Sequence, residues 1–386
     1  MKKRIAILGS TGSIGRNTLE VIAGFPDEFE VIGLSTNSNI GILNQQIKEF
    51  SPKLVAVGNS LCADNLRKGL NNRVKLLTGE EGIEDIAKDK RIDLVVLAIS
   101  GSAALLPLIR AIEAGKTIAL ANKEALVMAG SIIMQKAKAK KVKIIPIDSE
   151  QSAVWQCMEG KEKSILKKIY LTASGGPFKN IRKKEFKNIS IKDVLNHPCW
   201  KMGKKVTVDS ATLMNKGLEL IETMCLFDVD ISKICVVIHP QAIIHSMVEF
   251  IDGSLLAQLS MTDMRIPIQY ALTYPKRLAN RFPAIDFFKL KDLNFYKPDL
   301  ERFPCLGLAY EAAKKKGTFP CVLNAANEVA VAAFLNKKID FSSISKIIEK
   351  VMQRHKNAPH PDLDKVLSAH NWAKHEAEDL LNRLAG

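Results

Sequence analysis

The chain has 386 residues, which is enough for two or three domains and a sizeable buried core. Its apolar fraction of 47% and charged fraction of 25% are typical of a globular protein and exclude a disordered or fibrous one. No run of residues reaches the 18 apolar positions that a membrane helix needs, and no apolar stretch with a cleavage site follows Met1. We therefore expect neither a membrane span nor a signal peptide.

The formal net charge of +15 favours encounters with anions. One interpretation is a lysine-rich solvated surface, and another is attraction of phosphorylated small molecules. No helix-turn-helix or zinc-finger pattern accompanies the lysines, so nucleic acid is not an expected partner, and neither is a membrane. Seven cysteines occur singly, without CxxC or Cys/His ligand spacing, which is typical of buried thiols in a reducing compartment. This indicates a cytoplasmic protein.

The first 150 residues alternate short apolar strands with segments of helical periodicity, for example 103–114 and 123–139. Near-continuous apolar strands joined by helices predict a parallel sheet covered on both faces, the doubly wound α/β class. The expected strands are Arg4–Leu8, Phe29–Leu34, Leu54–Val57, Val74–Leu77, Asp93–Ala98, Thr117–Leu120 and Lys143–Ile147.

After Ser149 the pattern becomes mixed α+β, and then helical. The expected elements are a helix at Gln151–Met158, strands at Lys168–Thr172 and Val206–Val208, a helix at Met214–Phe227, three strands at Ile234–His239, Ile244–Ile251 and Ser254–Ser260, and helices at Leu306–Lys316, Pro320–Asn336, Ser342–Arg354 and Asp362–Leu384. We expect a Rossmann-like dinucleotide-binding domain at 1–149, an α+β catalytic domain at 150–275, a linker at 276–303 and a C-terminal helical bundle at 304–386.

A glycine turn follows the first strand. Gly9, Gly12 and Gly15 stand in a G-x-x-G-x-x-G spacing between a strand and a helix. In such a turn the first glycine bends the chain, the second lets the backbone approach a pyrophosphate and the third packs helix on strand. The pyrophosphate then binds free amides at the helix N-terminus. The sequence therefore predicts a dinucleotide site here.

The end of the second strand distinguishes NAD from NADP. NAD-specific sites usually place a carboxylate there to bind the ribose 2′-hydroxyl. This chain has Asn37, Ser38 and Asn39 and no acid between residues 33 and 39. Nothing there repels a 2′-phosphate, and Ser38 and Asn39 can donate hydrogen bonds to it. The prediction is NADP.

Two groups of carboxylates stand out further along the chain. Asp148 and Glu150 end an apolar strand, and residues i and i+2 of an extended chain point to one side. On a helix, Asn215 and Glu219 share a face, with Lys216 beside them. Three carboxylates brought together favour a cation between them, and an all-oxygen set suits Mg²⁺ or Mn²⁺ better than Zn²⁺. An exposed turn with a helix-capping Asp148 is the alternative interpretation.

Four further side chains are of the types that bind a phosphate monoester: Ser174, Ser210, Asn215 and Lys216. Ser174 precedes Gly175 and Gly176, and such a segment can form an anion-binding nest. Taken singly, each serine is as well explained as a turn residue.

Seven motifs occur in one order along the chain: Gly-Ser-Thr-Gly-Ser-Ile-Gly at 9–15, Ala-Asn-Lys-Glu at 121–124, Pro-Ile-Asp-Ser-Glu at 146–150, Ala-Ser-Gly-Gly-Pro-Phe at 173–178, His-Pro-Cys-Trp-Lys-Met-Gly at 197–203, Asp-Ser-Ala-Thr-Leu-Met-Asn-Lys-Gly-Leu-Glu at 209–219 and Asn-Ala-Ala-Asn-Glu at 324–328. With these motifs the chain strongly resembles the 1-deoxy-D-xylulose 5-phosphate reductoisomerase family over essentially its full length.

The resemblance implies an NADPH- and divalent-metal-dependent homodimer in the methylerythritol phosphate route to isoprenoids. Such an enzyme rearranges 1-deoxy-D-xylulose 5-phosphate to an aldehyde by retro-aldol cleavage and re-addition, and NADPH reduces the aldehyde to 2-C-methyl-D-erythritol 4-phosphate. The residues that it implies for the metal are Asp148, Glu150 and Glu219, with Lys123 as the active-site lysine beside them. Without the motif, Lys123 would be interpreted as a solvated helix residue.

The resemblance also assigns residues to the two organic ligands. Those for the substrate are Lys123, Ser149, Glu150, Ser174, His197, Trp200, Ser210, Asn215, Lys216 and Glu219. His197 begins a mobile flap at 197–205, and the resemblance gives it a catalytic role together with Lys123, Asp148, Glu150 and Glu219. Those for the cofactor are Thr11, Gly12, Ser13, Ile14, Asn37, Ser38, Asn39, Asn122, Glu124 and Gly203. The chain departs from the family in one place: the family commonly has Gly, a basic residue and Asn where residues 37–39 stand here.

Two other functions fit parts of the sequence. Semialdehyde dehydrogenases also begin with a G-x-x-G-x-x-G turn, but they need a nucleophilic cysteine beside a histidine, for which Cys157 and Cys199 are the nearest candidates. A non-catalytic NADP-binding sensor would need no metal.

Overall fold

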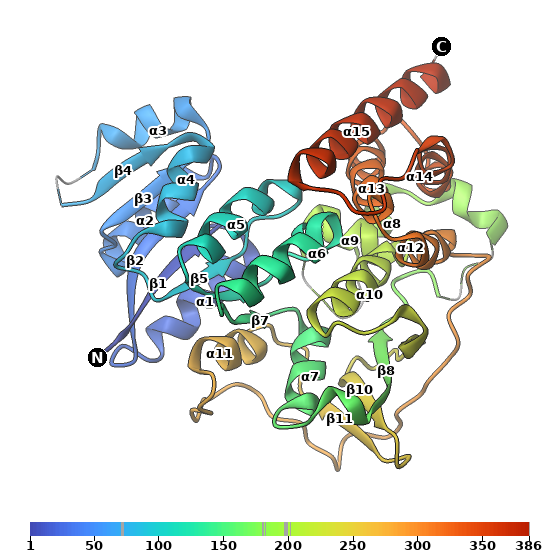
Figure 1. Cartoon of the computed structure of the whole chain (residues 1–386), viewed down its shortest axis with the longest axis horizontal. Coiled ribbons are helices and arrows are strands. Elements are labelled where there is room, and N and C mark those ends of the chain that lie inside the picture. The colour runs from blue at the N-terminus through green and yellow to red at the C-terminus, as the bar shows by residue number, and fades with distance from the viewer. Residues whose placement is uncertain (71–72, 180, 182, 197–199, 201, 386) are drawn as a thin grey trace. The chain divides into compact units, whose positions relative to one another are not determined.

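The computed structural model describes every residue except 71–72, 180, 182, 197–199, 201 and 386. The chain forms two compact units (Figure 1). The first unit contains Met1–Ala125, Ile133–Ser152 and Asp263–Phe282, and the second contains Leu126–Ile132, Ala153–Thr262 and Pro283–Gly386. In the described part of the chain, no helix combines the length and apolarity needed to cross a membrane.

The first unit is built on a parallel sheet with strand order β4-β3-β2-β1-β5-β6-β7. Five of its strands, which carry long apolar runs, are almost entirely buried, as expected of strands covered on both faces. The strands are β1 (Lys3–Leu8), β2 (Phe29–Thr36), β3 (Leu54–Val57), β4 (Lys75–Thr78), β5 (Leu94–Leu97), β6 (Thr117–Leu120) and β7 (Ile144–Pro146). The doubly wound α/β class is confirmed, and the strand order reverses between β1 and β5, which is where such sheets bind nucleotides.

Helices cover both faces of this sheet (Figure 1). They are α1 (Ser13–Ala23), α2 (Ile40–Phe50), α3 (Ser60–Arg67), α4 (Gly79–Lys88), α5 (Leu105–Glu113) and α11 (Arg265–Thr273). Helix α6 (Glu124–Ala139) follows β6 and has residues in both units. Helix α11 comes from the region that the sequence analysis assigns to the catalytic domain. Here it packs on α1, β6 and β7, and the Lys3 Nζ donates to the Leu272 carbonyl at 2.5 Å.

The second unit has a smaller mixed sheet with strand order β11-β10-β8-β9. Strand β10 is antiparallel to both of its neighbours, whereas β8 and β9 are parallel. The strands are β8 (Leu166–Ala173), β9 (Ile234–Ile238), β10 (Ile244–Phe250) and β11 (Leu255–Leu259). These four expected strands are confirmed.

A fifth expected strand, Val206–Val208, is wrong. These residues lie in α9 (Lys204–Ala211), which begins after Gly203. Three consecutive β-branched residues favour a strand by local propensity alone. Burial of Thr207, Val208 and Ala211 on one helical face outweighs that preference.

The remaining helices of the second unit are α8 (Ile191–Leu195), α10 (Met214–Leu226), α12 (Pro304–Lys315), α13 (Phe319–Leu335), α14 (Ser343–Arg354) and α15 (Leu363–Ala385), and α7 (Ser149–Met158) begins in the first unit and ends in the second. Helices α12 to α15 form the expected bundle. Apolar side chains of the bundle, of α10 and of β8–β10 belong to one continuous core, which includes Leu171, Leu220, Val248, Leu306 and Val322. The bundle and the mixed sheet therefore support each other.

Two glycines of the first turn are required by the packing. Gly9 has φ +91°, and a Cβ there would lie 2.6 Å from the Ala98 carbonyl oxygen. A Cβ on Gly15 would lie 2.4 Å from the Gly9 carbonyl oxygen and 2.5 Å from the Ser10 Cα. At Gly12, by contrast, the nearest atom would be at an ordinary 3.4 Å. Gly9 and Gly15 are thus required by the packing of the turn, whereas the backbone at Gly12 leaves room for a ligand.

This contrast predicts unequal effects on stability. Gly15→Ala should lower the free energy of unfolding by about 1–3 kcal/mol, because rigid backbone atoms would have to move away from the new methyl group. Gly12→Ala should cost less, since its methyl group meets only ordinary contacts. Thermal unfolding of both variants measures the difference, and equal Tm values for the two would contradict this account of the turn.

Candidate functional site

The candidate residues of the first unit lie at one edge of its sheet. The glycine turn follows β1, Asn37 to Asn39 follow β2, Asn122 to Glu124 follow β6, and Asp148 to Glu150 follow β7. All these strands are parallel, so their carboxyl ends share an edge. Residues separated by up to 140 positions in the chain are therefore placed along the same side of the sheet.

The turn after β1 presents an open helix N-terminus. Gly12 is the N-cap residue of α1, and no side chain caps the helix there. Gly12 and Ser13 are exposed, while Thr11 and Ile14 are half-buried. The Thr11 hydroxyl lies 2.6 Å from that of Thr36 at the end of β2. The uncapped amides and their helix dipole suit a phosphate group.

The loop after β2 is exposed at all three candidate positions, Asn37, Ser38 and Asn39. The Asn39 side-chain oxygen caps α2 by accepting a hydrogen bond from the Ile42 amide at 3.2 Å. The Asn37 carbonyl accepts the Asn59 amide at 2.9 Å. The loop therefore offers hydroxyl and amide donors to an anion, but no cationic side chain.

Asn122 holds two strand ends together. Its side-chain nitrogen donates to the carbonyls of Ile99 at 2.9 Å and Gly101 at 3.0 Å, and to Glu124 Oε2 at 3.0 Å. Its side-chain oxygen accepts the Ala125 amide at 2.8 Å. This scaffolding role of Asn122 was not foreseen from the sequence, which assigns it and Glu124 to the cofactor. The signal that could have indicated it is an Asn just after a strand and three residues before a helical amide.

Lys123 and Asp148 form a nearly buried ion pair. The Lys123 Nζ lies 2.5 Å from Asp148 Oδ2, and their side chains are only 9% and 15% exposed. The interpretation of Lys123 as a solvated helix residue is therefore wrong. Such a pair brings a positive and a negative charge to the edge of a nucleotide-binding sheet, where both can act on a bound ligand.

The carboxylates of Asp148 and Glu150 come together by a different route from the expected strand geometry. Strand β7 ends at Pro146, and α7 begins at Ser149. The Asp148 carbonyl accepts the Ser152 amide at 2.8 Å, so Asp148 occupies the capping position and Glu150 lies in the first helical turn. The Ser149 hydroxyl donates to Glu150 Oε2 at 2.6 Å. Of the alternative interpretation, the helix-capping position of Asp148 is correct, but the exposed turn is wrong, because the Asp148 side chain is only 15% exposed.

In the second unit, the Ser174 turn lies against the end of α9. Gly175 and Gly176 have positive φ values of +85° and +66°, and a Cβ on Gly176 would lie 3.0 Å from the Ser210 carbonyl oxygen. A cavity of about 390 Å³ opens beside Ser174 and is also lined by Lys179, Asp193, Asn196 and Pro240. The structure thus brings the Ser174 turn close to Ser210, which is 36 residues further along the chain.

Helix α10 carries the other polar candidates. Lys216 forms a salt bridge with Glu219, and the Asn215 side chain donates to the same carboxylate. Lys216 and Glu219 are 4% and 1% exposed. Helices α9 and α10 are separated by Leu213, whose φ of +59° is unusual for a branched residue. Because of this sharp turn, Ser210, Asn215 and Lys216 all stand at one junction between two helices.

The expected flap is described in part. Trp200 is half-buried, with its ring centroid 6.1 Å from that of His245. Gly203 is exposed and forms the N-cap of α9. His197 lies outside the described residues.

The cysteine that a semialdehyde dehydrogenase would need is not supported. Burial raises the pKa of the Cys157 thiol to about 11, so that it stays protonated and weakly nucleophilic near neutral pH. Cys199, the other candidate, lies outside the described residues.

Three family models match the chain. One described as 1-deoxy-D-xylulose 5-phosphate reductoisomerase matches residues 5–130, its C-terminal domain model matches 144–227, and a further DXP reductoisomerase C-terminal domain model matches 259–376. Together they cover most of both units.

Relatives and solved structures agree over the full length. The 1-deoxy-D-xylulose 5-phosphate reductoisomerase of Thermoanaerobacter pseudethanolicus is 52% identical over 96% of this chain and 97% of its own, and that of Endomicrobium trichonymphae is 49% identical over 99% and 100%. A solved DOX-P reductoisomerase in complex with NADPH, fosmidomycin and magnesium is 39% identical, with a TM-score of 0.93 over 99% of both chains. The enzyme from Zymomonas mobilis in complex with NADPH gives 39% identity and a TM-score of 0.92, again over 99% of both chains. The chain therefore belongs to the 1-deoxy-D-xylulose 5-phosphate reductoisomerase family.

Proposed function

We propose that this chain converts 1-deoxy-D-xylulose 5-phosphate to 2-C-methyl-D-erythritol 4-phosphate, using NADPH and a divalent metal, in the synthesis of isoprenoid precursors. Family membership supports the reaction. The structural observation that carries it is the buried Lys123–Asp148 pair at the carboxyl edge of a nucleotide-binding sheet. A purely NADP-binding sensor would have no need for a charged pair at this edge.

NADPH would bind along the edge of the first unit's sheet. The uncapped N-terminus of α1, with Thr11, Gly12, Ser13 and Ile14, suits its pyrophosphate. Ser38 and the N-terminus of α2, capped by Asn39, suit the 2′-phosphate, and no carboxylate at 37–39 opposes it. Asn122 and Glu124 would act mainly by fixing the strand ends that border the nicotinamide half. Solved relatives contain NADPH.

The metal would be held by Asp148, Glu150 and Glu219, the three carboxylates that the family resemblance assigns to it. An oxygen-only donor set fits Mg²⁺ or Mn²⁺, and solved relatives contain magnesium. When bound, such an ion acts as a Lewis acid that polarises a substrate carbonyl. Lys123 compensates the charge of Asp148 at the carboxyl edge of the sheet. Lys216 compensates the charge of Glu219 within α10.

The chain's own residues would orient the substrate. Ser174, Ser210, Asn215 and Lys216 surround the α9–α10 junction and the Ser174 turn, and they supply hydroxyl, amide and ammonium donors for the phosphate. Lys123 and Ser149 would bind substrate oxygens near Asp148 and Glu150. The flap, from His197 through Trp200 to Gly203, would cover the bound substrate and exclude water.

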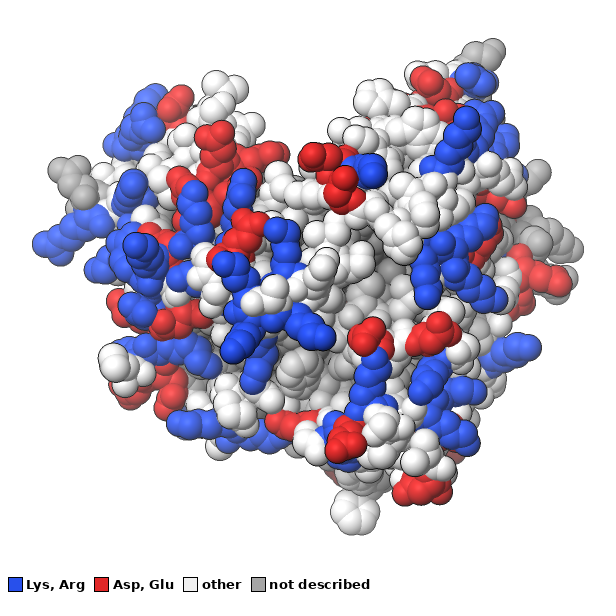
Figure 2. Space-filling model, viewed as in Figure 1, with Lys and Arg blue, Asp and Glu red and all other residues white. Residues whose placement is uncertain are grey.

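The positive net charge fits a substrate and a cofactor that both carry phosphate groups. Figure 2 shows Lys and Arg spread over the visible face with Asp and Glu among them. This mixed distribution is that of a solvated surface that attracts small anions in general, rather than the concentrated basic stripe of a nucleic-acid-binding protein.

The active form is proposed to be a cytoplasmic homodimer. Free thiols at the six described cysteines fit a reducing compartment. The outer face of the mixed sheet carries half-buried Tyr170, Cys235, Val237 and Met247, and the edge strand β11 exposes Leu255 and Leu256. An apolar sheet face beside an unpaired strand edge is a surface that a second copy of the chain would cover.

The first test of the function is NADPH oxidation with 1-deoxy-D-xylulose 5-phosphate. The purified chain should turn over with Mg²⁺ or Mn²⁺ and lose this activity when a chelator removes the metal. The loss of absorbance of NADPH follows the reaction. No turnover with metal present would reject the proposal, and turnover unaffected by a chelator would reject its metal-dependent part.

Glu150→Gln tests the assigned ligand. It should lower kcat/KM by about 10³-fold, roughly 4 kcal/mol of transition-state stabilisation, because a neutral amide is a weaker ligand than a carboxylate. NADPH binding, measured by fluorescence, should stay at the wild-type level. Glu159→Gln, at an exposed position just after the same helix, is the matched control and should keep wild-type turnover. Similar losses in both variants would remove the special role of Glu150.

Met247→Asp tests the proposed dimer. Light scattering of the wild type should give twice the 42.6 kDa of one chain. A charge at the centre of the apolar sheet face should weaken dimerisation by at least about 100-fold, or 2.7 kcal/mol, and give monomers at micromolar concentration. Leu61→Asp, at a position that is 75% exposed in the first unit, should leave the mass unchanged. A dimeric Met247→Asp variant would show that this face is not the interface.

A further inference from the structure

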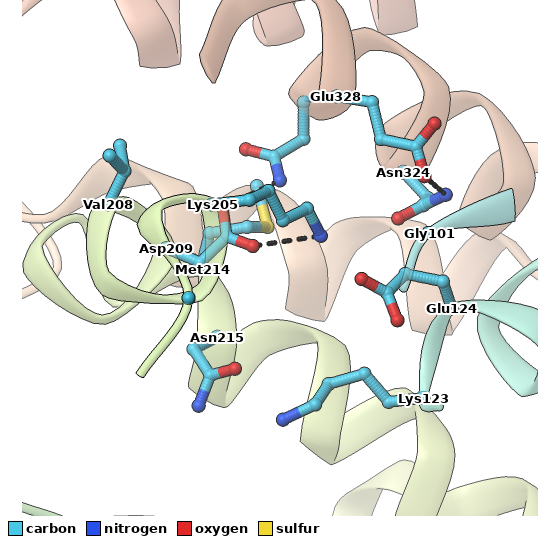
Figure 3. A network of polar contacts seen from close by, with 12 residues as sticks. Gly101, Lys123, Glu124, Lys205, Val208, Asp209, Met214, Asn215, Asn324 and Glu328 are labelled. Carbon is cyan, nitrogen blue, oxygen red and sulfur yellow. Dashed lines mark hydrogen bonds and ion pairs between the residues drawn. The ribbon is translucent and has the colours of Figure 1, made fainter. Parts of the chain in front are cut away.

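Asp209 is a buried carboxylate to which the proposed function gives no role. It lies in the last turn of α9 and is 1% exposed. Its Oδ2 lies 2.9 Å from the Lys205 Nζ, one helical turn earlier, and Figure 3 shows this ion pair. Its Oδ1 accepts a hydrogen bond at 2.8 Å from the side-chain nitrogen of Asn327, 118 residues further along the chain. A carboxylate this deep in a protein needs such partners, because an unpaired one would be costly.

Asn327 comes from the middle of α13, in the C-terminal bundle, and is fully buried. Its nitrogen must face Asp209, since a carboxylate only accepts hydrogen bonds. Its side-chain oxygen then has no hydrogen-bond partner among the described residues. A buried oxygen of this kind is unfavourable, and an apolar side chain of similar size would avoid it. The hydrogen bond to Asp209 is therefore the interaction that this amide contributes.

The support behind Asn327 is rigid. Val322, Leu323, Ala326 and Ala330 of the same helix are all fully buried in the common core. Helix α13 also packs against α9. The Asp209–Asn327 hydrogen bond thus ties the end of α9 to a helix that has little freedom to move.

The end of α9 leads directly into the strained junction. Ser210 follows Asp209, and the Leu213 amide donates to the Ser210 carbonyl at 3.1 Å. The Thr212 hydroxyl bonds back to the Asp209 carbonyl at 3.1 Å. Leu213 then adopts its left-handed conformation, which costs of order 1–3 kcal/mol and persists only where the surroundings fix it. The contacts of residue 209 are among those that fix it.

We infer that Asn327 and Asp209 are positioning residues for the phosphate pocket: their buried hydrogen bond holds the end of α9, and thereby Ser210 and the junction that carries Asn215 and Lys216. The inference rests on the proposed function, because it assumes that these three residues bind the substrate phosphate. It gives the Asn-Ala-Ala-Asn-Glu motif at 324–328 a role in substrate affinity although the bundle contributes none of the proposed ligand-binding residues. Neither Asn327 nor Asp209 touches the reacting atoms.

Asn327→Leu tests the inference, since leucine keeps the volume and removes the donor. We expect the KM for 1-deoxy-D-xylulose 5-phosphate to rise about 10-fold, equivalent to 1.4 kcal/mol, while kcat changes by less than about threefold. Inhibition by inorganic phosphate should weaken by a similar factor. NADPH affinity should be unchanged, because the cofactor does not depend on this junction.

Thr318→Val is the matched control. Thr318 is the N-cap residue of α13, is 1% exposed, and has side-chain hydrogen bonds with His355 and Asn357. Both variants should lower Tm, but only Asn327→Leu should raise KM. The inference would be overturned if KM were unchanged in Asn327→Leu, or if KM rose equally in Thr318→Val. Either result would mean that the hydrogen bond between Asn327 and Asp209 contributes to stability only.

If Asn327→Leu does not fold, Asn327→Ser tests the positioning role of Asn327 instead. Its hydroxyl can donate to Asp209 through one water molecule, so KM should rise by at least about threefold but less than in a variant without a donor. A wild-type KM would overturn the inference. Failure of the wild-type chain to reduce the substrate would be a separate result, because it would reject the proposed function, and the inference with it.

Discussion

Buried carboxylates and the cations that compensate them are the constraint on which this molecule depends. Asp148, Glu219 and Asp209 have side chains that are 15%, 1% and 1% exposed, and each has a lysine ammonium within salt-bridge distance. Breaking such a pair from one side costs about 3–5 kcal/mol, because the remaining charge stays buried. The lysines are thus fixed in place as firmly as the carboxylates. The result is a set of charges whose positions are determined before any ligand arrives, which is what electrostatic catalysis requires.

The architecture follows from the sequence where local patterns and burial agree. Apolar strands bounded by helices gave the parallel sheet, and Gly9 and Gly15 marked the turn because their lack of a side chain is required by backbone atoms in contact. The predicted strand at Val206–Val208 is wrong because the strand propensity of three consecutive β-branched residues is outweighed by the burial of one helical face. The attachment of Asp263–Phe282 to the first unit could not be foreseen either, since the surface that α11 covers is distant in sequence.

The candidate site also depends on contacts between residues that are distant in sequence. Residue types and order made Asp148, Glu150, Ser174 and Lys216 candidates, but spacing rules describe only neighbours on one strand or helix. They could not show that Lys123 is buried against Asp148 rather than solvated, because 25 residues and a strand separate the two. Nor could they pair Asp209 with Asn327, whose hydrogen bond joins helices 118 residues apart. The burial of a side chain and its contacts with residues distant in sequence come from tertiary packing. They decide whether a charged side chain can act on a ligand or is only solvated.

The buried pairs also couple the proposed metal to the proposed substrate contacts. Asp148 has two oxygens, and one of them already faces the Lys123 ammonium at 2.5 Å. A divalent ion held by this carboxylate would place a second positive charge near Lys123, and both charges would attract an anionic oxygen of the substrate. The same reasoning applies in α10, where Glu219 compensates Lys216 and is also a proposed ligand. Under the proposed function, the carboxylates that compensate Lys123 and Lys216 are also those that would hold the metal, so these charges are in position before metal and substrate bind.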